Sequence, residues 1–233
     1  PDVRLRQRAQ FELVERNDAQ TLIQTLNGSG NLHAQLYAKL HALWGLGQLH
    51  RYGKGDHSSH FIKAATSNEV ELCVSACRII GDVQNPRYSD ALLTCLGHAS
   101  RRVQSHAAIA LGKMKHQAAT TALWEALKKN NATKDRYLRI AIVNALASIG
   151  DEAGAVGQLN AAERELRLGA VLVLRQMKSD KVASFLADTE KIVREEALRA
   201  VYDNRLTKQY PAVMKLTDQA SDFMLTNQRR ILV

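Results

Sequence analysis

Proline and aromatic residues are scarce in this chain. Its 233 residues include three prolines, and phenylalanine, tryptophan and tyrosine together make up 5% of the sequence. Strand-rich sandwiches and barrels draw on aromatic and β-branched residues, so this composition disfavours them. No hydrophobic run approaches the roughly 18 residues of a membrane span, and no charged-then-apolar leader opens the sequence. We therefore expect no membrane insertion by this chain.

Cysteine is also sparse, and its spacing excludes two common uses. The three residues are Cys73, Cys77 and Cys95, without a C-x-x-C pair. An odd number at these spacings predicts neither a disulfide framework nor a zinc site. All three lie among apolar residues, so we expect them to be buried as small hydrophobic side chains.

The charge balance is basic, with 32 Lys and Arg against 23 Asp and Glu, a formal net charge of +9. Such a balance suits an anionic partner, either a nucleic acid or an acidic protein. The basic residues are scattered from Arg4 to Arg230 without a block of five or six. Scattered charge is also typical of a solvated surface, so the net charge alone does not mark a nucleic-acid site.

A helical repeat is what the sequence has in abundance. Its clearest copy is RVQSHAAIALGKM, where Val103, Ala107, Leu111 and Gly112 share one helix face. The central alanines of seven copies are residues 9, 42, 76, 107, 145, 170 and 197, spaced by 33, 34, 31, 38, 25 and 27 residues. A small alanine at mid-helix lets a neighbouring helix approach closely, while apolar residues one turn away seal the contact.

Other residues of the copies predict where each helix ends and what lies between copies. We expect the first copy to bury Leu5, Ala9 and Leu13. Glycine tolerates the left-handed conformation of helix C-termini, so Gly47, Gly81, Gly112 and Gly150 are predicted to end their helices. Asp82 and Asp151 suit the turn and N-cap that follow. Second amphipathic segments are residues 89–99, 120–130 and 181–190.

These observations predict an all-α fold in which about seven helical hairpins form an α-α superhelix, and their resemblance to HEAT repeats implies a right-handed, HEAT-like solenoid. One hairpin cannot bury its apolar face alone, whereas stacked hairpins share a continuous core and present a concave side. We expect residues 1–233 to form a single repeat domain. Its end units are expected to be irregular, because the first copy lacks a preceding helix and the chain closes on the atypical segment SDFMLTNQRRILV.

The repeat unit resembles a known family. The pattern V-x-x-x-A-x-x-x-L-G, with an arginine beside the valine as in Val193 and Arg194, resembles the HEAT repeat. It is more closely similar to the HEAT-like repeat of phycobilisome lyases. The likeness covers nearly the whole chain. It implies the fold more strongly than the function, because such repeats serve scaffolds, regulators and a few enzymes.

A narrower likeness concerns residues 3–16 and 38–49. They resemble the segment after the β-propeller in large exported bacterial dehydrogenase-like proteins that also carry a c-type haem domain. This implies that the chain, which begins with Pro1, is a fragment of a larger multi-domain protein in the periplasm or cell envelope; otherwise we expect a cytoplasmic location. The chain has no propeller and no C-x-x-C-H motif, so no cofactor or redox role is placed on its residues.

The candidate binding residues lie on the helix that carries the V-R pair, which the HEAT resemblance places on the concave side. Guanidinium groups there offer paired donors to an acidic peptide or to phosphates. The alternative is that the arginines pair with acidic residues of neighbouring repeats and tie the stack together. Trp44 and Trp124 are both typical of a repeat core, although a partly exposed Trp44 on the concave helix is a candidate binding hot spot. The candidates are Arg6, Arg8, Lys39, His41, Trp44, His106, Arg167, Arg194 and Arg199.

The sequence offers little catalytic chemistry. Asp56, His57 and His60 are weak candidates for a metal site in the loop-like segment HRYGKGDHSSH, but no H-E-x-x-H motif occurs and a solvated connector explains the segment equally well. Ser75 and Ser105 lack a base, and no G-x-S-x-G motif occurs. We predict no catalytic residue, metal or cofactor.

Three functions remain open. The first is a non-catalytic scaffold that binds a protein or other domains of the same polypeptide, within an exported dehydrogenase-like protein. The second is a nucleic-acid-binding HEAT protein similar to DNA alkyl-base glycosylases, which would need a basic channel with aromatic residues. The third is a chaperone similar to bilin lyases, for which the sequence shows no distinguishing residue.

Overall fold

The computed structural model describes residues 2–28, 33–130 and 135–216, and all regular secondary structure in these ranges is helical. The predicted all-α fold is therefore confirmed. The segment SDFMLTNQRRILV lies outside the described residues. The packing divides the chain into two compact units, Pro1–Met114 and Lys115–Val233.

Each of the seven sequence copies forms one helix. We call these seven the inner helices. They are α1 (Val3–Glu15), α3 (His33–Arg51), α5 (Val70–Val83), α7 (Arg101–Lys113), α9 (Arg136–Ile149), α11 (Arg164–Gln176) and α12 (Lys191–Asp203). Helical periodicity is a local property of the sequence, which is why the copies were recognisable without the structure.

Shorter outer elements alternate with the inner helices. They are α2 (Ala19–Asn27), α4 (Ser58–Ala65), α6 (Ser89–Leu96), α8 (Thr120–Asn130), α10 (Glu152–Gly157) and the 3₁₀ helix η3 (Asp180–Ala187). Short connecting or terminal pieces are η1 (Pro86–Tyr88), η2 (Gln117–Ala119), η4 (Thr207–Gln209) and α13 (Tyr210–Met214). The predicted segments 89–99 and 120–130 correspond to α6 and α8. The segment 181–190 falls largely in η3, a tighter helix than expected, and its Val182 and Phe185 are buried.

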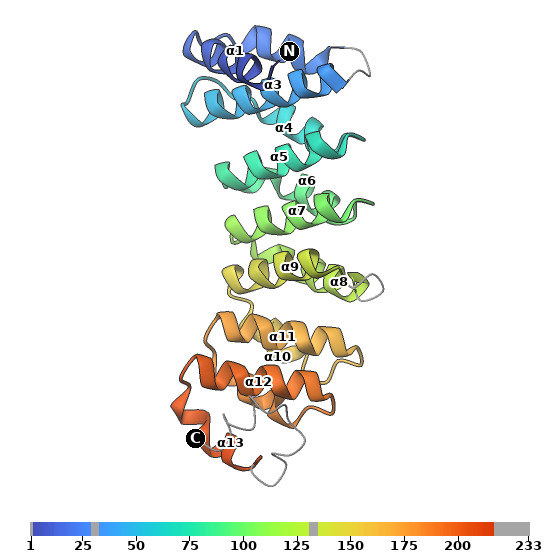
Figure 1. The fold of residues 1–233 in the computed structure, drawn as a ribbon, viewed down its shortest axis with the longest axis vertical. Helices are drawn as coiled ribbons and strands as arrows, with labels where there is room; N and C mark the ends of the chain where they lie inside the picture. The colour runs from blue at the N-terminus through green and yellow to red at the C-terminus, as the bar shows by residue number, and fades with distance from the viewer. Residues whose placement is uncertain (1, 29–32, 131–134, 217–233) are drawn as a thin grey trace. The chain divides into compact units, whose positions relative to one another are not determined.

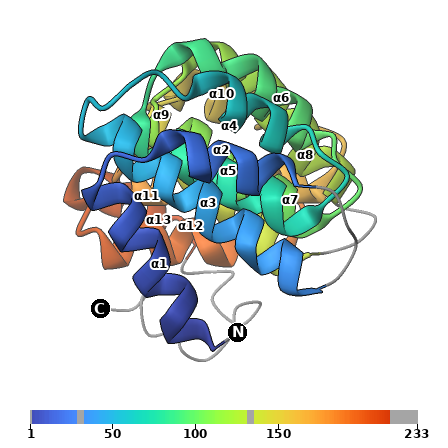
Figure 2. The ribbon, with the colours of Figure 1, turned by 90° about the horizontal axis from the view of Figure 1, so that it is seen from above.

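In unit 1, each outer helix packs on the inner helix that follows it: α2 on α3, α4 on α5, and α6 on α7. The inner helices also pack in sequence, α1 on α3, α3 on α5 and α5 on α7. Figure 2 shows α2, α4 and α6 on one side of this unit and α3, α5 and α7 on the other. Unit 1 is thus a two-layered row of helical hairpins.

Unit 2 repeats the same arrangement. Here α8 packs on α9, α10 on α11, and η3 on α12. The inner helices α9, α11 and α12 follow one another along the unit, as Figure 1 shows, with α11 in contact with both others.

The central alanines lie where neighbouring helices meet. Six of the seven are buried, and Ala76, Ala107, Ala170 and Ala197 are fully buried. The exception is Ala9 on α1, which is exposed together with Leu5, whereas Leu13 is half-buried. The prediction that this first copy buries its row was wrong, because α1 packs on α3 through its opposite side, where Gln10 is buried.

The glycine predictions were correct at one position. Gly150 ends α9 with a φ of 87°, in the left-handed region. Gly47, Gly81 and Gly112 instead lie inside α3, α5 and α7. A Cβ atom on Gly81 would lie 3.0 Å from both the Cα and the Cβ of Ala110, so this glycine allows α5 and α7 to approach. Left-handed residues at or just after the helix ends are instead Asn17, Gln84, Lys115, Lys178 and Arg205.

The two aspartates that follow glycines also have different roles. Asp151 is the N-cap of α10, and its carboxylate accepts a hydrogen bond from the Gly154 N–H at 3.1 Å, as predicted. Asp82 lies within α5 and pairs with Lys113 of α7 at 2.7 Å. The N-cap prediction for Asp82 was wrong because α5 continues to Val83.

Candidate interaction surface

The inner helices of unit 1 carry one row of exposed and half-buried side chains that combines aromatic, aliphatic and basic groups. We call this row the unit 1 face. It comprises Tyr37, His41 and Trp44 on α3, Arg78 on α5, and His106 and Ile109 on α7.

Equivalent positions of successive repeats build this face. Trp44, Arg78 and Ile109 each follow the central alanine of their helix by two residues. Because α3, α5 and α7 pack side by side, the same position in each helix faces the same side of the layer. Trp44 is 36% exposed and Ile109 is 41% exposed. Large apolar side chains therefore flank an arginine on one surface.

Trp44 is held by a chain of contacts that begins on α1. The Gln10 side chain donates a hydrogen bond to the Gln48 Oε1 at 3.0 Å, and its own Oε1 lies 2.8 Å from the His41 Nδ1. The His41 ring meets Trp44 edge to face, with centroids 5.0 Å apart. An aromatic side chain fixed in this way loses little entropy when a partner covers it.

Tyr37 is held from α1 as well. The Arg6 guanidinium lies over its ring, 4.8 Å from the centroid, at a distance typical of a cation–π contact. The packing of α1 on α3 thus supports two aromatic side chains of the unit 1 face. Of the predicted binding residues, Arg6 and His41 act here mainly by positioning Tyr37 and Trp44.

Most charges near the face are paired within unit 1. Arg102 pairs with Glu71, and Asp82 lies 2.7 Å from the Lys113 Nζ and 3.8 Å from Arg51. Arg78 is exposed and forms no hydrogen bond or ion pair with a described residue. It is therefore available to an acidic group of a partner.

The two histidines contribute little charge at neutral pH. Burial lowers the pKa of His41, and the nearby Arg6 lowers it further. Burial likewise lowers the pKa of His106, with Arg78 and Arg102 adding to the effect and Glu71 opposing it. Arg78 therefore provides the fixed positive charge in the middle of the unit 1 face.

Arg167 is placed differently from the prediction. It is buried, its guanidinium donates to both carboxylate oxygens of Asp188 at 2.7 and 3.2 Å, and it also donates to the carbonyls of Ala161 and Ala162. The alternative stated from the sequence, an arginine paired with an acidic residue of the adjoining repeat, describes this side chain. Arg167 directly follows Leu166, the buried first apolar residue of its copy, so its side chain stabilises the fold instead of facing a partner.

The remaining basic candidates are dispersed. Arg194 donates to the carbonyls of Asp188 and Thr189 at 2.7 and 3.0 Å. Arg199 lies within 3.6 Å of Glu196 and 3.4 Å of Asp203. Arg8 is exposed on α1, and Lys39 is half-buried on α3. Arg8 and Lys39 belong to unit 1, whereas Arg167, Arg194 and Arg199 belong to unit 2.

The weak metal candidates have other contacts. The Asp56 carboxylate accepts hydrogen bonds from Ser58 and from Arg87, the latter at 2.8 Å, and these bonds lower its pKa. His57 is buried, with its Nε2 3.3 Å from the Lys54 carbonyl. In the part of the chain that the structure describes, no three histidine, cysteine or acidic residues form a group able to hold a metal ion.

The cysteines are buried in unit 1, as predicted. The Cys73 thiol donates to the Ser67 carbonyl at 3.0 Å, and the Cys95 thiol to the Ala65 carbonyl at 3.2 Å. Burial raises the pKa of Cys73. A thiol with a raised pKa is a poor nucleophile at neutral pH, so Cys73 contributes packing.

Sequence reasoning missed three residues of the face: Tyr37, Arg78 and Ile109. Most of the sequence candidates stand one or three residues after the first apolar residue of their copy, as Arg167 follows Leu166 and His106 follows Val103. The informative position is two residues after the central alanine. It is occupied by exposed Trp44 in α3, Arg78 in α5 and Ile109 in α7. Aligning the copies and reading this position would have identified Arg78 and Ile109.

The comparisons with known proteins agree with the repeat architecture. A family model described as HEAT repeats matches residues 58–134. The complex of CpcE and CpcF of phycocyanin lyase from Nostoc sp. PCC7120 contains a chain of similar structure, with a TM-score of 0.52 and 18% identity over 92% of each chain. An engineered protein is similar at a TM-score of 0.41 and 18% identity, covering 76% of this chain and 94% of its own. A search of curated proteins finds no match.

These findings support a HEAT-like repeat protein. At 18% identity the likeness to the phycocyanin lyase complex concerns the fold. Among the described helices, none combines the length and apolar character needed to cross a bilayer.

Proposed function

We propose that this chain is a non-catalytic protein-binding module and that its partner covers the unit 1 face. The observation that carries the proposal is the exposed row of Trp44, Arg78 and Ile109 on three adjacent helices. Aromatic side chains and arginine dominate the binding energy of protein interfaces. A row of this kind suits a partner surface with apolar side chains around a carboxylate.

The distribution of charge favours a protein over a nucleic acid. A site for duplex DNA neutralises several phosphates with arranged Lys and Arg side chains. Near the unit 1 face, Arg102 and Lys113 are paired with Glu71 and Asp82. Among the residues of the face itself, Arg78 is the unpaired cation. One cation between apolar groups matches a single acidic side chain better than a phosphate backbone.

The fold gives further support. Repeat solenoids present extended surfaces for binding other chains, and the similar Nostoc chain occurs in a complex of CpcE and CpcF. The bilin lyase-like alternative and the dehydrogenase-like parent stay predictions. Reading the coding sequence on both sides of this chain tests the latter, which requires a propeller or a c-type haem motif there.

The test uses the tagged chain, an extract of its source organism and quantitative mass spectrometry after crosslinking. The double variant Trp44→Ala/Arg78→Glu is expected to reduce recovery of the main partner at least tenfold, since hot-spot truncations cost about 2 kcal/mol or more. Tyr52→Ala is the matched control, because Tyr52 is 66% exposed but lies beyond the end of α3.

The same variants decide against the proposal in two ways. Equal recovery of the partner by wild type and by the double variant would place binding elsewhere. The nucleic-acid hypothesis would be favoured if the chain bound duplex DNA tightly and Arg78→Glu abolished that binding. The affinity would also have to fall with salt concentration as steeply as contacts with several phosphates predict. Circular dichroism melts of each variant check that the fold is intact.

A further inference from the structure

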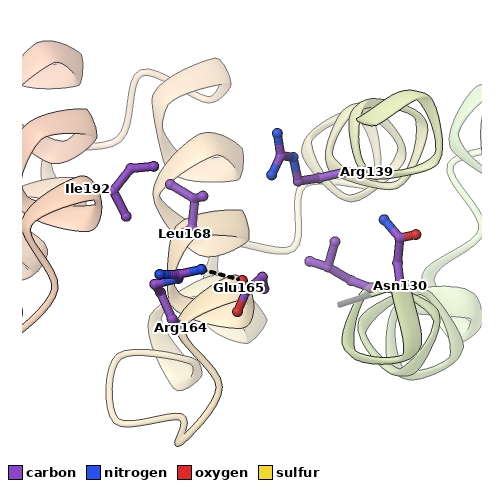
Figure 3. Close-up of a pocket in the computed structure, with 7 residues that line it drawn as sticks. Asn130, Arg139, Arg164, Glu165, Leu168 and Ile192 are labelled. Carbon is purple, nitrogen blue, oxygen red and sulfur yellow. Dashed lines mark hydrogen bonds and ion pairs between the residues drawn. The ribbon is translucent and has the colours of Figure 1, made fainter. Parts of the chain in front are cut away.

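A small pocket opens among four helices of unit 2, and none of its lining residues belongs to the unit 1 face. It has a volume of about 140 Å³ and lies between α8, α9, α11 and α12. Figure 3 shows Arg139 on one side of this space and Leu168 and Ile192 on the other. Its lining consists of Leu127, Asn130, Arg139, Arg164, Glu165, Leu168 and Ile192.

Three of the lining residues, Leu127, Leu168 and Ile192, are aliphatic. Leu127 and Leu168 are buried, whereas Ile192 is 47% exposed at the rim. A cavity of roughly 150 Å³ lined by aliphatic side chains accommodates a guest about the size of benzene. The pocket therefore has room for one leucine- or isoleucine-sized side chain, which would find apolar contacts on several sides.

The polar groups at the pocket are not equivalent. Arg164 is paired, with its guanidinium 2.9 Å from Glu165 and 3.9 Å from Glu190. Asn130 donates a hydrogen bond to the Asp135 carbonyl at 2.8 Å. Arg139 is half-buried, and its guanidinium forms no hydrogen bond or ion pair with a described residue. Arg139 is thus the group at this pocket that is ready to receive an anion.

The net charge of the pocket lining limits which anion Arg139 can bind. The lining holds two arginines and one glutamate, which gives a net charge of +1. One carboxylate would be matched by Arg139, whose fork of donors suits bidentate binding. A phosphate backbone would bring several negative charges next to Glu165, and it has no apolar group to fill the aliphatic part.

We propose that this pocket binds a peptide segment that carries an aliphatic side chain next to a carboxylate. The aliphatic group lies between Leu168 and Ile192, and the carboxylate pairs with Arg139. The proposal is independent of the unit 1 face, because it uses other residues of the other unit. Its partner is defined by chemistry as an acidic, aliphatic-containing peptide.

The test is a nuclear magnetic resonance titration of the full chain labelled with ¹³C at leucine and isoleucine methyl groups. The probe is a blocked eight-residue peptide of Gly and Ser with a central Asp-Leu pair. We expect the Ile192 and Leu168 methyl signals to shift in a saturable way. Peptides with Asn-Leu or Asp-Ala at the centre are expected to bind at least fivefold more weakly, because each lacks one of the two contacts.

Two variants on the same helix give the matched comparison. Arg139→Gln is expected to weaken binding at least tenfold, whereas Arg136→Gln, on an exposed residue outside the pocket lining, changes it less than twofold. Neither arginine pairs through its side chain with a described residue, so both variants are expected to fold, and their methyl spectra verify this.

Three outcomes would overturn the proposal. The first is equal affinity of wild type and Arg139→Gln for the Asp-Leu peptide. The second is a saturable shift of the same methyl groups by inorganic phosphate at the same concentration, which would make the pocket a general anion site. The third is displacement of the peptide by a single-stranded oligonucleotide, which would make it a nucleic-acid site. Trp44→Ala leaves peptide binding unchanged, so failure of the unit 1 proposal is distinguishable from failure here.

Discussion

At the residue scale, the position after each repeat's first apolar residue shows one recurring contact. Four side chains there donate to the carbonyl of the residue six positions earlier: Cys73 to Ser67, Gln104 to His98, Arg167 to Ala161, and Arg194 to Asp188. Each contact satisfies a carbonyl in the turn that leads into an inner helix. The arginine of the V-R pair thus stabilises the turn before its helix by hydrogen bonding, although its charge suggested that it binds a partner.

Where the repeat has Ile142 at this position, the side chain cannot donate a hydrogen bond. Asn130, the last residue of α8, instead donates to the Asp135 carbonyl at 2.8 Å. The Asp135 carbonyl also accepts a hydrogen bond from the Arg139 N–H at 3.1 Å, so it is not the counterpart of the carbonyls that the other four repeats satisfy.

The first prediction concerns the pair of Arg167 and Asp188. Arg167→Ala is expected to lower the free energy of unfolding by about 3 kcal/mol, because it leaves a buried carboxylate unpaired and two carbonyls without a donor. Urea unfolding at pH 7 measures the change.

Arg199→Ala is the control for this prediction, since its ion pairs with Glu196 and Asp203 are exposed and such pairs contribute about 0 to 1 kcal/mol. A loss below about 1 kcal/mol for Arg167→Ala would contradict the assignment of Arg167 to the fold.

At the element scale, glycine sets how closely two helices pack. Gly81 of α5 faces the Ala110 backbone of α7, and the two helices form one continuous contact in unit 1. The ends of these helices use other residues in the left-handed conformation, Gln84 for α5 and Lys115 after α7. Polar side chains can adopt this conformation at a modest cost, so the glycines remain at the helix interface.

A glycine-to-alanine pair tests this role. Gly81→Ala is expected to destabilise the protein by about 1 to 3 kcal/mol, because the added methyl group has no space against Ala110. Gly157→Ala in α10 is expected to be neutral or to stabilise by up to about 1 kcal/mol, since nothing lies within 4 Å of its Cβ position. Thermal unfolding of both variants measures the difference. Equal stability of the two would show that α5 and α7 can separate without cost.

At the scale of the whole molecule, stability is distributed along rows of hairpins. In unit 1, α5 packs on α3, α4 and α7, and in unit 2, α11 packs on α9, α10 and α12. Each hairpin of a repeat protein is stabilised mainly by its immediate neighbours, so a local change is expected to remain local.

Hydrogen exchange followed by mass spectrometry tests this expectation. In Gly81→Ala, amide exchange is expected to accelerate most in α5 and α7, and to stay near the wild-type rate in α11 and α12. Gly157→Ala provides the reference for a silent substitution. Uniform acceleration over the whole chain would instead show that it unfolds as one cooperative body.

The sequence by itself determined where the inner helices lie and, except for Ala9, which central alanines their contacts bury. Copies such as that of Ala107 were recognisable because helical periodicity and residue size are written locally in the chain. The pattern also placed Trp124 in the core, where it is now found buried.

Only the tertiary structure decided the roles of Gly81, Arg167 and Leu5. Gly81 depends on how near α7 comes, Arg167 on the position of Asp188, and the 61% exposure of Leu5 on the face that α1 turns to α3. The structure likewise showed that Arg78 and Arg139 lack partners among the described residues. These properties are set by residues distant in sequence, because burial and pairing arise only when separate helices are brought together.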